Sequence, residues 1–293
     1  MNRLHLLSAG MLTTVQDLGR FGYAQYGISA SGAADPLALR AANLLVGNAE
    51  NAAVLEMTLS GAEIVFDHPA TIALAGADFG ASHAPWQAVE VRAGETVRCG
   101  AARNGARCYL AVRGGLDVPH AMGSASTHVM TGIGGRPLRR GDILLIGDAA
   151  VRKPRRPARG YPVPDSPTRL RTTPGPQARN FGDELYRSAY RVSEASNRMG
   201  IRLLGPELPS PGGQMITEGV GLGAVQAPPG GQPIILFVDH QTTGGYPKPA
   251  NVISADFWRL GQLRPRDEVR FERATMEGAL ALLRDQEEWL YSL

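Results

Sequence analysis

The stretch that decides the fold of this 293-residue chain is Ile234–Pro249, IILFVDHQTTGGYPKP. Its first five residues are all apolar, which is typical of a strand buried on both faces. A buried strand holds the residues after it at a fixed position, and here they form a polar loop with two consecutive glycines. The stretch therefore predicts a β framework with a loop of polar, potentially reactive side chains at the end of one of its strands.

Short segments between glycine and proline turns fill most of the remaining chain, which has 36 glycines and 21 prolines. Hairpins are predicted at 55–59 with 62–66 and at 89–92 with 96–99. Further strands are predicted at 107–112, 143–146, 168–172, 189–193, 201–204 and 268–271. Helices are predicted at 33–45, with Ser31 or Asp35 as cap, at 183–188 and at 275–290. The predicted fold class is mainly β with a few short helices.

Two domains are predicted, at residues 1–150 and 168–293. Proline and arginine dominate residues 151–167, which offer almost nothing to bury and predict a linker. The length also favours two domains over one. A weak internal repeat supports two similar β domains: PLRRGDIL at 137–144 resembles LRPRDEVR at 263–270, and each is predicted to close its half with a turn and a strand.

The composition restricts the possible classes of function. Hydrophobic residues make up 43% of the chain and charged residues 19%, which indicates a packed globular protein. The net charge of +3 is too small to recruit nucleic acid, and no apolar run is long enough for a signal peptide or a membrane span. Only Cys99 and Cys108 are present, so we expect reduced thiols and a cytoplasmic location.

Several familiar sites are missing from the sequence. It contains no GxxxxGK[ST] phosphate loop and no histidine spacing typical of a metal site. The glycine-rich run at 219–223 is followed by prolines where a dinucleotide-binding fold needs a helix. We therefore expect no metal site and no dinucleotide site.

The polar loop after the buried strand contains the main candidate residues. Asp239 could orient or deprotonate an attacking group, and Gly244 and Gly245 let backbone N–H groups approach an oxyanion closely. Lys248, one of only two lysines, would supply a positive charge. The alternative is an ordinary turn with a glycine pair. The remaining candidates in this loop are Gln241, Thr242, Thr243 and Tyr246.

Two further clusters contain polar candidates. Asn197 and Arg198 lead into the strand predicted at 201–204 and could bind a carboxylate or an amide, although Arg198 equally suits a structural ion pair. The other cluster precedes the helix predicted at 33–45, where Ser31 and its neighbours are explained most simply as the start of that helix. Its candidates are Gln16, Asp17, Arg20 and Ser31.

Five motifs make the chain resemble a known family: VQDLGR at 15–20, SGAAD at 31–35, NLLVGN at 43–48, SNRMGIRL at 196–203 and DHQTTGGYP at 239–247. The chain resembles the C subunit of bacterial 5-oxoprolinase, a KipA-like family of the biotin-dependent carboxyltransferase type that is related to part of urea carboxylase. It departs from the usual pattern at Ala34, where methionine is expected, and at His240, where arginine is usual.

The resemblance implies two tandem cyclophilin-like β-barrel domains and an obligate complex. The implied partners are a KipI-like B subunit and an A subunit, which with this chain would convert 5-oxo-L-proline to L-glutamate using ATP. No covalently bound cofactor is expected, and the sequence does not reveal an ATP site. The resemblance also groups the loop candidates with Asn197 and Arg198 in one cleft around a small amide substrate.

Two alternatives remain open at the sequence level. One is a carboxyltransferase half that acts on a urea-like amide with carboxybiotin; neither lysine lies in a biotin-accepting Met-Lys-Met, so biotin would come from another chain. The other is a regulatory subunit that antagonises a KipI-type kinase inhibitor. In the enzyme, Asp239, Thr242, Thr243 and Lys248 are the expected catalytic residues. Replacing Asp239 or Lys248 by alanine is expected to lower turnover at least ten-fold without changing the melting temperature.

Overall fold

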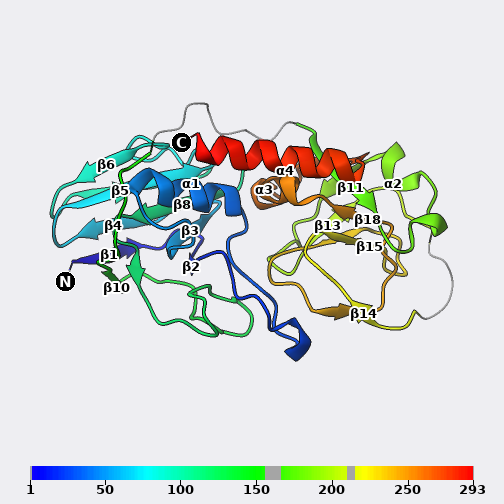
Figure 1. Ribbon diagram of the computed structural model, residues 1–293, viewed down its shortest axis with the longest axis horizontal. Coiled ribbons are helices and arrows are strands. Elements are labelled where there is room, and N and C mark those ends of the chain that lie inside the picture. The colour runs from blue at the N-terminus through cyan, green and yellow to red at the C-terminus, as the bar shows by residue number, and fades with distance from the viewer. Residues whose placement is uncertain (1, 156–165, 210–214, 293) are drawn as a thin grey trace. The chain divides into compact units, whose positions relative to one another are not determined.

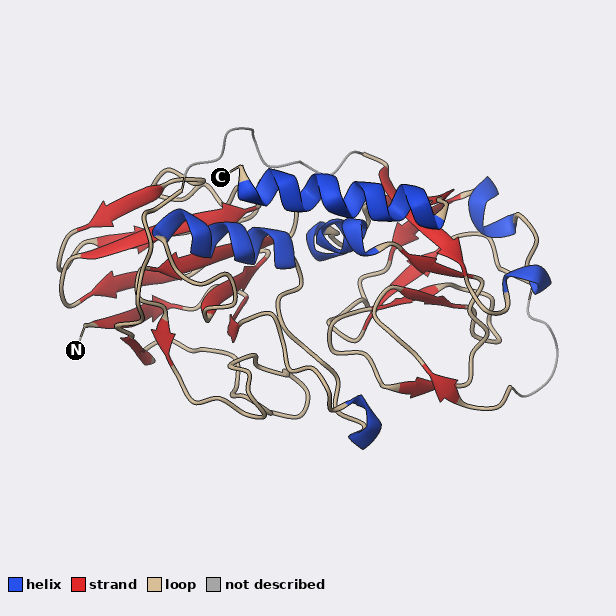
Figure 2. Ribbon diagram, in the orientation of Figure 1, coloured by secondary structure: helices blue, strands red, loops and turns tan. Residues whose placement is uncertain are grey.

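The computed structural model describes residues 2–155, 166–209 and 215–292 and contains two compact units. Unit 1 comprises Met1–Arg20, Ser31–Val163 and Glu288–Leu293, and unit 2 comprises Phe21–Ala30 and Pro164–Glu287. The predicted domain limits differ from these units at residues 21–30 and 288–293, and the two units divide the predicted linker, residues 151–167, between them. Strands form the framework of each unit, as Figures 1 and 2 show, so the mainly β prediction is confirmed.

Within its described residues, unit 1 contains ten strands in two five-stranded antiparallel sheets. The strands are β1 Arg3–Ser8, β2 Leu12–Gln16, β3 Val54–Thr58, β4 Glu63–Phe66, β5 Ala70–Gly76, β6 Ala88–Val91, β7 Thr96–Arg98, β8 Arg107–Val112, β9 Leu116–Asp117 and β10 Ile143–Ile146. One sheet has the order β7-β4-β1-β10-β9 and the other the order β2-β3-β8-β5-β6. Strand β8 has the predicted bounds.

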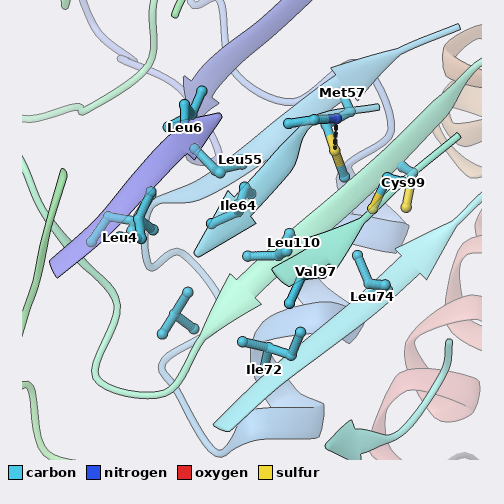
Figure 3. Close-up of a cluster of buried hydrophobic side chains, with 14 of the residues drawn as sticks. Leu4, Leu6, Leu55, Met57, Ile64, Ile72, Leu74, Val97, Cys99 and Leu110 are labelled. Carbon is cyan, nitrogen blue, oxygen red and sulfur yellow. Dashed lines mark hydrogen bonds between the residues drawn. The ribbon is translucent and has the colours of Figure 1, made fainter. Parts of the chain in front are cut away.

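The two sheets of unit 1 enclose one hydrophobic core (Figure 3). Leu4 and Ile64 enter it from the first sheet, and Leu55, Leu74 and Leu110 enter it from the second. In β1 and β4 every second residue is buried, as expected for strands with one covered face. Strand β8 is buried at all six residues, because helix α1 (Pro36–Val46) packs on its other face.

Helix α1 begins and ends with ordinary capping chemistry. Asp35 caps it by accepting a hydrogen bond from the Ala38 N–H at 2.9 Å, and Gly47 ends it in the left-handed conformation at φ 82°. The carbonyl of Gly47 accepts the Arg152 N–H at 2.7 Å. The described start of the predicted linker therefore docks on α1, while its residues 156–165 lie outside the described part of the chain.

The two predicted hairpins are wrong, because the strands beside each turn belong to different sheets. Strand β3 pairs with β2 and β8, whereas β4 pairs with β1 and β7. Likewise β6 pairs with β5, whereas β7 pairs with β4. At Gly61, between β3 and β4, a Cβ atom would lie 2.2 Å from the Cys99 Cβ, so glycine is needed where the chain crosses between sheets. Hydrophobic periodicity identifies a strand but not its partner.

Unit 2 is a closed barrel with the strand order β11-β18-β15-β16-β13-β12-β19. A separate two-stranded ribbon pairs β14 with β17. The strand bounds are β11 Thr168–Pro174, β12 Ala189–Val192, β13 Gly200–Leu204, β14 Glu218–Gly219, β15 Ala224–Gln226, β16 Ile234–Leu236, β17 Thr243–Gly244, β18 Ala250–Val252 and β19 Glu268–Arg273. The other helical segments of the chain are η1 Ala24–Tyr26, η2 Ala178–Asn180, α2 Glu184–Arg187, η3 Ser254–Asp256, α3 Phe257–Gln262 and α4 Met276–Tyr291.

The two faces of the barrel strands have different surroundings. Cross-strand partners share a face, so Ile201, Val225 and Ile235 lie together on one face, and all three are buried. Gln226, which pairs with Ile234, lies on the opposite face and is also buried. A buried polar residue on the second face means that other parts of the chain cover strand β15 there.

The sequence repeat corresponds to a repeated structural turn, at Arg139–Asp142 and at Arg264–Asp267. In each, the carboxylate of the fourth residue accepts the N–H of the first at 2.8 Å. The third residue has a positive φ, 88° in one turn and 75° in the other. Its N–H donates at 2.8 Å to a neighbouring strand, to Leu6 in β1 or to Val192 in β12. The two similar sequence segments therefore fold into the same turn.

Across the described residues, every helix is too short or too polar to cross a lipid bilayer.

Candidate functional site

The candidate loop starts where strand β16 ends in unit 2. The strand is shorter than predicted, but backbone pairing continues beyond it: the Phe237 N–H donates to the Met199 carbonyl at 3.0 Å, and the Asp239 N–H donates to the Arg198 carbonyl at 2.8 Å. Phe237 is also buried. The framework thus fixes the start of the loop, as the sequence indicates.

Asp239 and Arg198 form a buried ion pair. Arg198 Nε lies 2.9 Å from Asp239 Oδ2, and its second contact, from a terminal nitrogen to Oδ1, is 3.3 Å. The side chains are 8% and 1% exposed. This two-point geometry is typical of strong arginine–carboxylate pairs. Each charge neutralises the other, so the pair braces the start of the loop, and an unchanged melting temperature is no longer expected when Asp239 is replaced.

Lys248 lies in a second charged group at the other end of the loop. Its Nζ donates to Glu218 Oε1, which also accepts a 3.1 Å bond from Gln177 Nε2. Gln177 Oε1 in turn accepts the backbone N–H of Lys248 at 2.9 Å. The Lys248 side chain is 5% exposed, whereas that of Glu218 is 40% exposed. The ammonium group is therefore enclosed by protein, while its counter-charge remains in contact with water.

We expect the Lys248–Glu218 pair to contribute to stability only when Glu218 is ionised. The hydrogen bonds from Lys248, and then from Gln177, hold the pKa of Glu218 below its ordinary value of 4.5. A pKa lowered by folding adds stability above the unfolded value, and that stability is lost as the pH falls through the folded value. Glu218→Gln should therefore lower stability at neutral pH and have less effect below about pH 4.5.

Denaturation of the wild type and of Glu218→Gln between pH 3 and pH 8 measures this difference. In a Lys248→Met background the glutamate-to-glutamine change should have little effect at any pH. A stability difference between the wild type and Glu218→Gln that is independent of pH would contradict the assignment.

Between the two charged groups, the ribbon β14–β17 covers strand β15. Glu218 pairs in register with Gly244. A Cβ atom on Gly244 would lie 2.7 Å from Gln226 Nε2 and 3.4 Å from the Val220 side chain. The Gln241 side chain donates to Gln226 Oε1 at 3.4 Å. Gly244 is thus pressed against the buried amide of Gln226, and a larger residue would not fit there.

The other predicted residues of unit 2 lie around this group. Asn197 is exposed and uses its side-chain oxygen to accept the Met199 N–H at 2.8 Å. Thr243 and Tyr246 are exposed, and Thr242 is half-buried. His240 has Nδ1 2.6 Å from the Gln241 carbonyl, and burial lowers its pKa.

The four candidates of unit 1 bind the segment at 124–127. Asp17 accepts the Ser124 hydroxyl at 2.6 Å, the Ala125 N–H at 2.7 Å, the Gly19 N–H at 2.7 Å and the Ser126 hydroxyl. The three remaining side chains donate to carbonyls in the same segment; they are Gln16, Arg20 and Ser31. In the structure all four therefore hold the framework of unit 1 together.

Three site residues are missing from the sequence-based prediction: Gln177, Glu218 and Gln226. Glu218 directly precedes the glycine-rich run at 219–223, which resembles part of a dinucleotide motif. Its position depends on the pairing of β14 with β17, which no local pattern indicates. Among the described residues there is no group of three or more side chains suited to hold a metal ion.

A family model described as carboxyltransferase domain, subdomain A and B, matches residues 26–273. The chain belongs to this carboxyltransferase domain family. It is 41% identical over 304 residues to the C subunit of 5-oxoprolinase from Escherichia coli (strain K12), covering 99% of this chain and 97% of that protein. It is 37% identical to the same 5-oxoprolinase component of Haemophilus influenzae, covering 98% and 96%. The family resemblance inferred from the five motifs is confirmed.

A solved structure in this family has the same fold. The crystal structure of Kluyveromyces lactis urea carboxylase superposes with a TM-score of 0.89 at 30% identity. The match covers 98% of this carboxyltransferase-family chain but only 29% of that protein. The chain therefore corresponds to one part of the larger enzyme, and to the whole length of the two bacterial relatives.

Proposed function

We propose that this chain is the C subunit of a bacterial 5-oxoprolinase, which converts 5-oxo-L-proline to L-glutamate with consumption of ATP. The observation that supports this most is the match to the C subunit of E. coli 5-oxoprolinase over 99% of this chain and 97% of that protein. The proposed partners are a KipI-like B subunit and an A subunit, and the proposed location is the cytoplasm.

The proposed reaction is the hydrolysis of a cyclic amide. Water adds to the ring carbonyl carbon, the carbon–nitrogen bond breaks, and the ring nitrogen becomes the amine of glutamate. Negative charge develops on the carbonyl oxygen as water adds, so the site must place hydrogen-bond donors or a cation beside that oxygen. In this chain the group around the β14–β17 ribbon supplies both, through side-chain amides and the enclosed ammonium of Lys248.

We propose different roles for the two charged groups of unit 2. Lys248 has three N–H donors, and one of them binds Glu218, so the others can reach a developing oxyanion or a carboxylate. Arg198 and Asp239 are paired with each other and position the start of the loop. Thr242 and Thr243 offer hydroxyl groups from the ribbon side.

A second candidate function is the carboxyltransferase half-reaction on a urea-like amide. The superposition on urea carboxylase over 98% of the chain favours it. Biotin would then be carried by another chain, because neither Lys153 nor Lys248 lies in a Met-Lys-Met sequence. Both functions require a site for the carbonyl oxygen of a planar amide.

Reconstitution tests the proposed function. The chain is purified alone and together with its A and B partners, and glutamate release from 5-oxo-L-proline is measured with and without ATP. We expect turnover only from the complete mixture with ATP, and none from the isolated chain. Turnover by this chain alone, or full activity of a mixture without it, would contradict the proposal. Carboxylation of urea with carboxybiotin and no release of glutamate would favour the second function.

A further inference from the structure

Gln226 has a buried amide donor without a partner. Its Nε2 has no hydrogen-bond acceptor within the part of the chain that the structure describes, and the residue is 1% exposed. Nearly all buried polar groups in folded proteins are hydrogen-bonded, because an unpaired donor destabilises the folded state. A partner for the unpaired nitrogen of Gln226 must therefore come from outside the described protein atoms, as a water molecule or as a polar group of a ligand.

The neighbours of this nitrogen show where such a partner would bind. The space that a Cβ of residue 244 would occupy lies 2.7 Å from Gln226 Nε2 and 3.6 Å from Gln241 Nε2. The two amide nitrogens thus face Gly244 from the same side, and the close approach of Gln226 requires glycine there. A carbonyl oxygen that entered beside the Gln226 amide, after a shift of the Gln241 side chain, would be within hydrogen-bond reach of both nitrogens.

Gln226 is covered by the Gln241 side chain and by the short β14–β17 ribbon. Gln241 is exposed, and its 3.4 Å bond to Gln226 Oε1 is at the long end of the hydrogen-bond range. Strands β14 and β17 have two residues each, and a ribbon of this size is only marginally stable. A small rotation of the Gln241 side chain would break this long bond, uncover the amide of Gln226 and keep Gln241 Nε2 beside it, without disturbing the barrel.

We propose that Gln226 binds substrate by donating a hydrogen bond from Nε2 to the carbonyl oxygen of an amide, with Gln241 as the second donor to that oxygen. The choice of 5-oxo-L-proline as that amide rests on the proposed function, and urea presents the same carbonyl chemistry. Lys248 belongs to the same arrangement, because its partner Glu218 pairs in register with Gly244.

Two matched variants test the proposal. Gln226→Met keeps the length of the side chain and removes the donor. Gln232→Met is the control, because the amide of Gln232 is fully paired with Gly205, donating and accepting at 3.0 Å. Both variants are made in the full chain and examined alone and in the complex with the A and B partners.

The first measurement is the melting temperature of the ligand-free chain. Removing an unpaired buried donor should raise it by about 2–4 °C in Gln226→Met. Gln232→Met loses two satisfied hydrogen bonds and should not raise it. A purely structural role for Gln226 predicts the opposite sign, so a lower melting temperature in Gln226→Met would overturn the proposal.

The second measurement is the KM of the complex for 5-oxo-L-proline. We expect Gln226→Met to raise it at least about ten-fold, and Gln232→Met to leave it unchanged. Equal KM values in an active wild-type complex and in Gln226→Met would overturn this inference and leave the proposed function intact.

If the wild-type complex releases no glutamate, the proposed function fails, and binding decides the role of Gln226 separately. Calorimetric titration of the full chain with 2-pyrrolidinone and with urea identifies which amide binds. The proposal requires at least ten-fold weaker binding of the preferred amide by Gln226→Met. Equal binding by the two proteins, or no binding of either amide by the wild type, would overturn it.

Discussion

Replacing Arg198 by methionine is expected to lower the free energy of unfolding by about 3–5 kcal/mol. The variant removes the arginine that binds Asp239, whose side chain is 1% exposed, and the loss of a positively charged partner from a buried carboxylate is strongly unfavourable. Denaturant unfolding of the full chain, followed by a signal from unit 2, measures the loss.

An exposed pair of the same length provides the control for this prediction. Arg187 and Glu184 also lie 2.9 Å apart, but their side chains are 66% and 50% exposed. Arg187→Met should cost less than about 1 kcal/mol, because water solvates the remaining carboxylate. The two pairs have the same shortest distance and the same charge types, so a much larger loss in Arg198→Met reports mainly the burial and the two-point geometry of its pair.

The double variant Arg198→Met/Asp239→Leu separates two contributions to stability: the net contribution of the ion pair, and the destabilisation caused by removing only one of its charges. Replacing both partners of a buried ion pair by apolar residues is often neutral, so the double variant should recover most of the lost stability. If the single variant Arg198→Met costs no more than Arg187→Met, the pair does not brace the loop.

Local chemistry explains why parts of the fold were predictable. Strand β8 has the predicted bounds, because six residues of strand-forming sequence end just before a glycine pair. Helix α1 starts close to the predicted position, because Asp35 and Pro36 together define a helix N-terminus. The pairing of β3 with β8, rather than with β4, depends on two sheets closing over one core, and no window of sequence contains that information.

The position of the candidate site could be predicted from the sequence, but the residues that pair with its charged side chains could not. The loop after Ile234–Val238 contains acidic, basic, hydroxyl and amide side chains, and these residue types suggest a functional site before their positions in space are known. Asp239, however, binds an arginine 41 residues earlier in the chain, and Lys248 binds a glutamate 30 residues earlier. The strand register of the barrel brings Arg198 and Asp239 together. The pairing of β14 with β17 brings Glu218 close to Lys248. The unpaired amide of Gln226 is visible only in three dimensions, because pairing is a property of the folded surroundings.

The two charged groups of the loop therefore differ in what their loss should change. Arg198 and Asp239 are both buried, so removal of either leaves a charge without water. Lys248 is enclosed, but Glu218 is 40% exposed and can be solvated once the lysine is gone. Loss of Arg198 should therefore appear mainly as lost stability, and loss of Lys248 mainly as lost activity.

Lys248→Met is accordingly expected to lower the turnover number of the reconstituted complex by about 10²–10³-fold, the usual effect of removing one well-placed group that stabilises an oxyanion. Its melting temperature should fall less than that of Glu218→Gln, since the remaining carboxylate of Glu218 is solvated, whereas Glu218→Gln leaves the enclosed ammonium of Lys248 without its counter-charge. Steady-state kinetics on 5-oxo-L-proline, with separate kcat and KM values, measure the effect.

Two further lysine variants decide whether position and shape matter as well as charge. Lys153→Met removes the chain's other lysine, which is exposed, and should leave turnover unchanged. Lys248→Arg keeps the charge but introduces a planar guanidinium where the side chain is only 5% exposed, so it should restore little activity. Turnover above about a tenth of the wild-type value in Lys248→Met would mean that the lysine only holds the ribbon through Glu218. In that case Glu218→Gln should have the same small effect on turnover, because both variants break one structural contact.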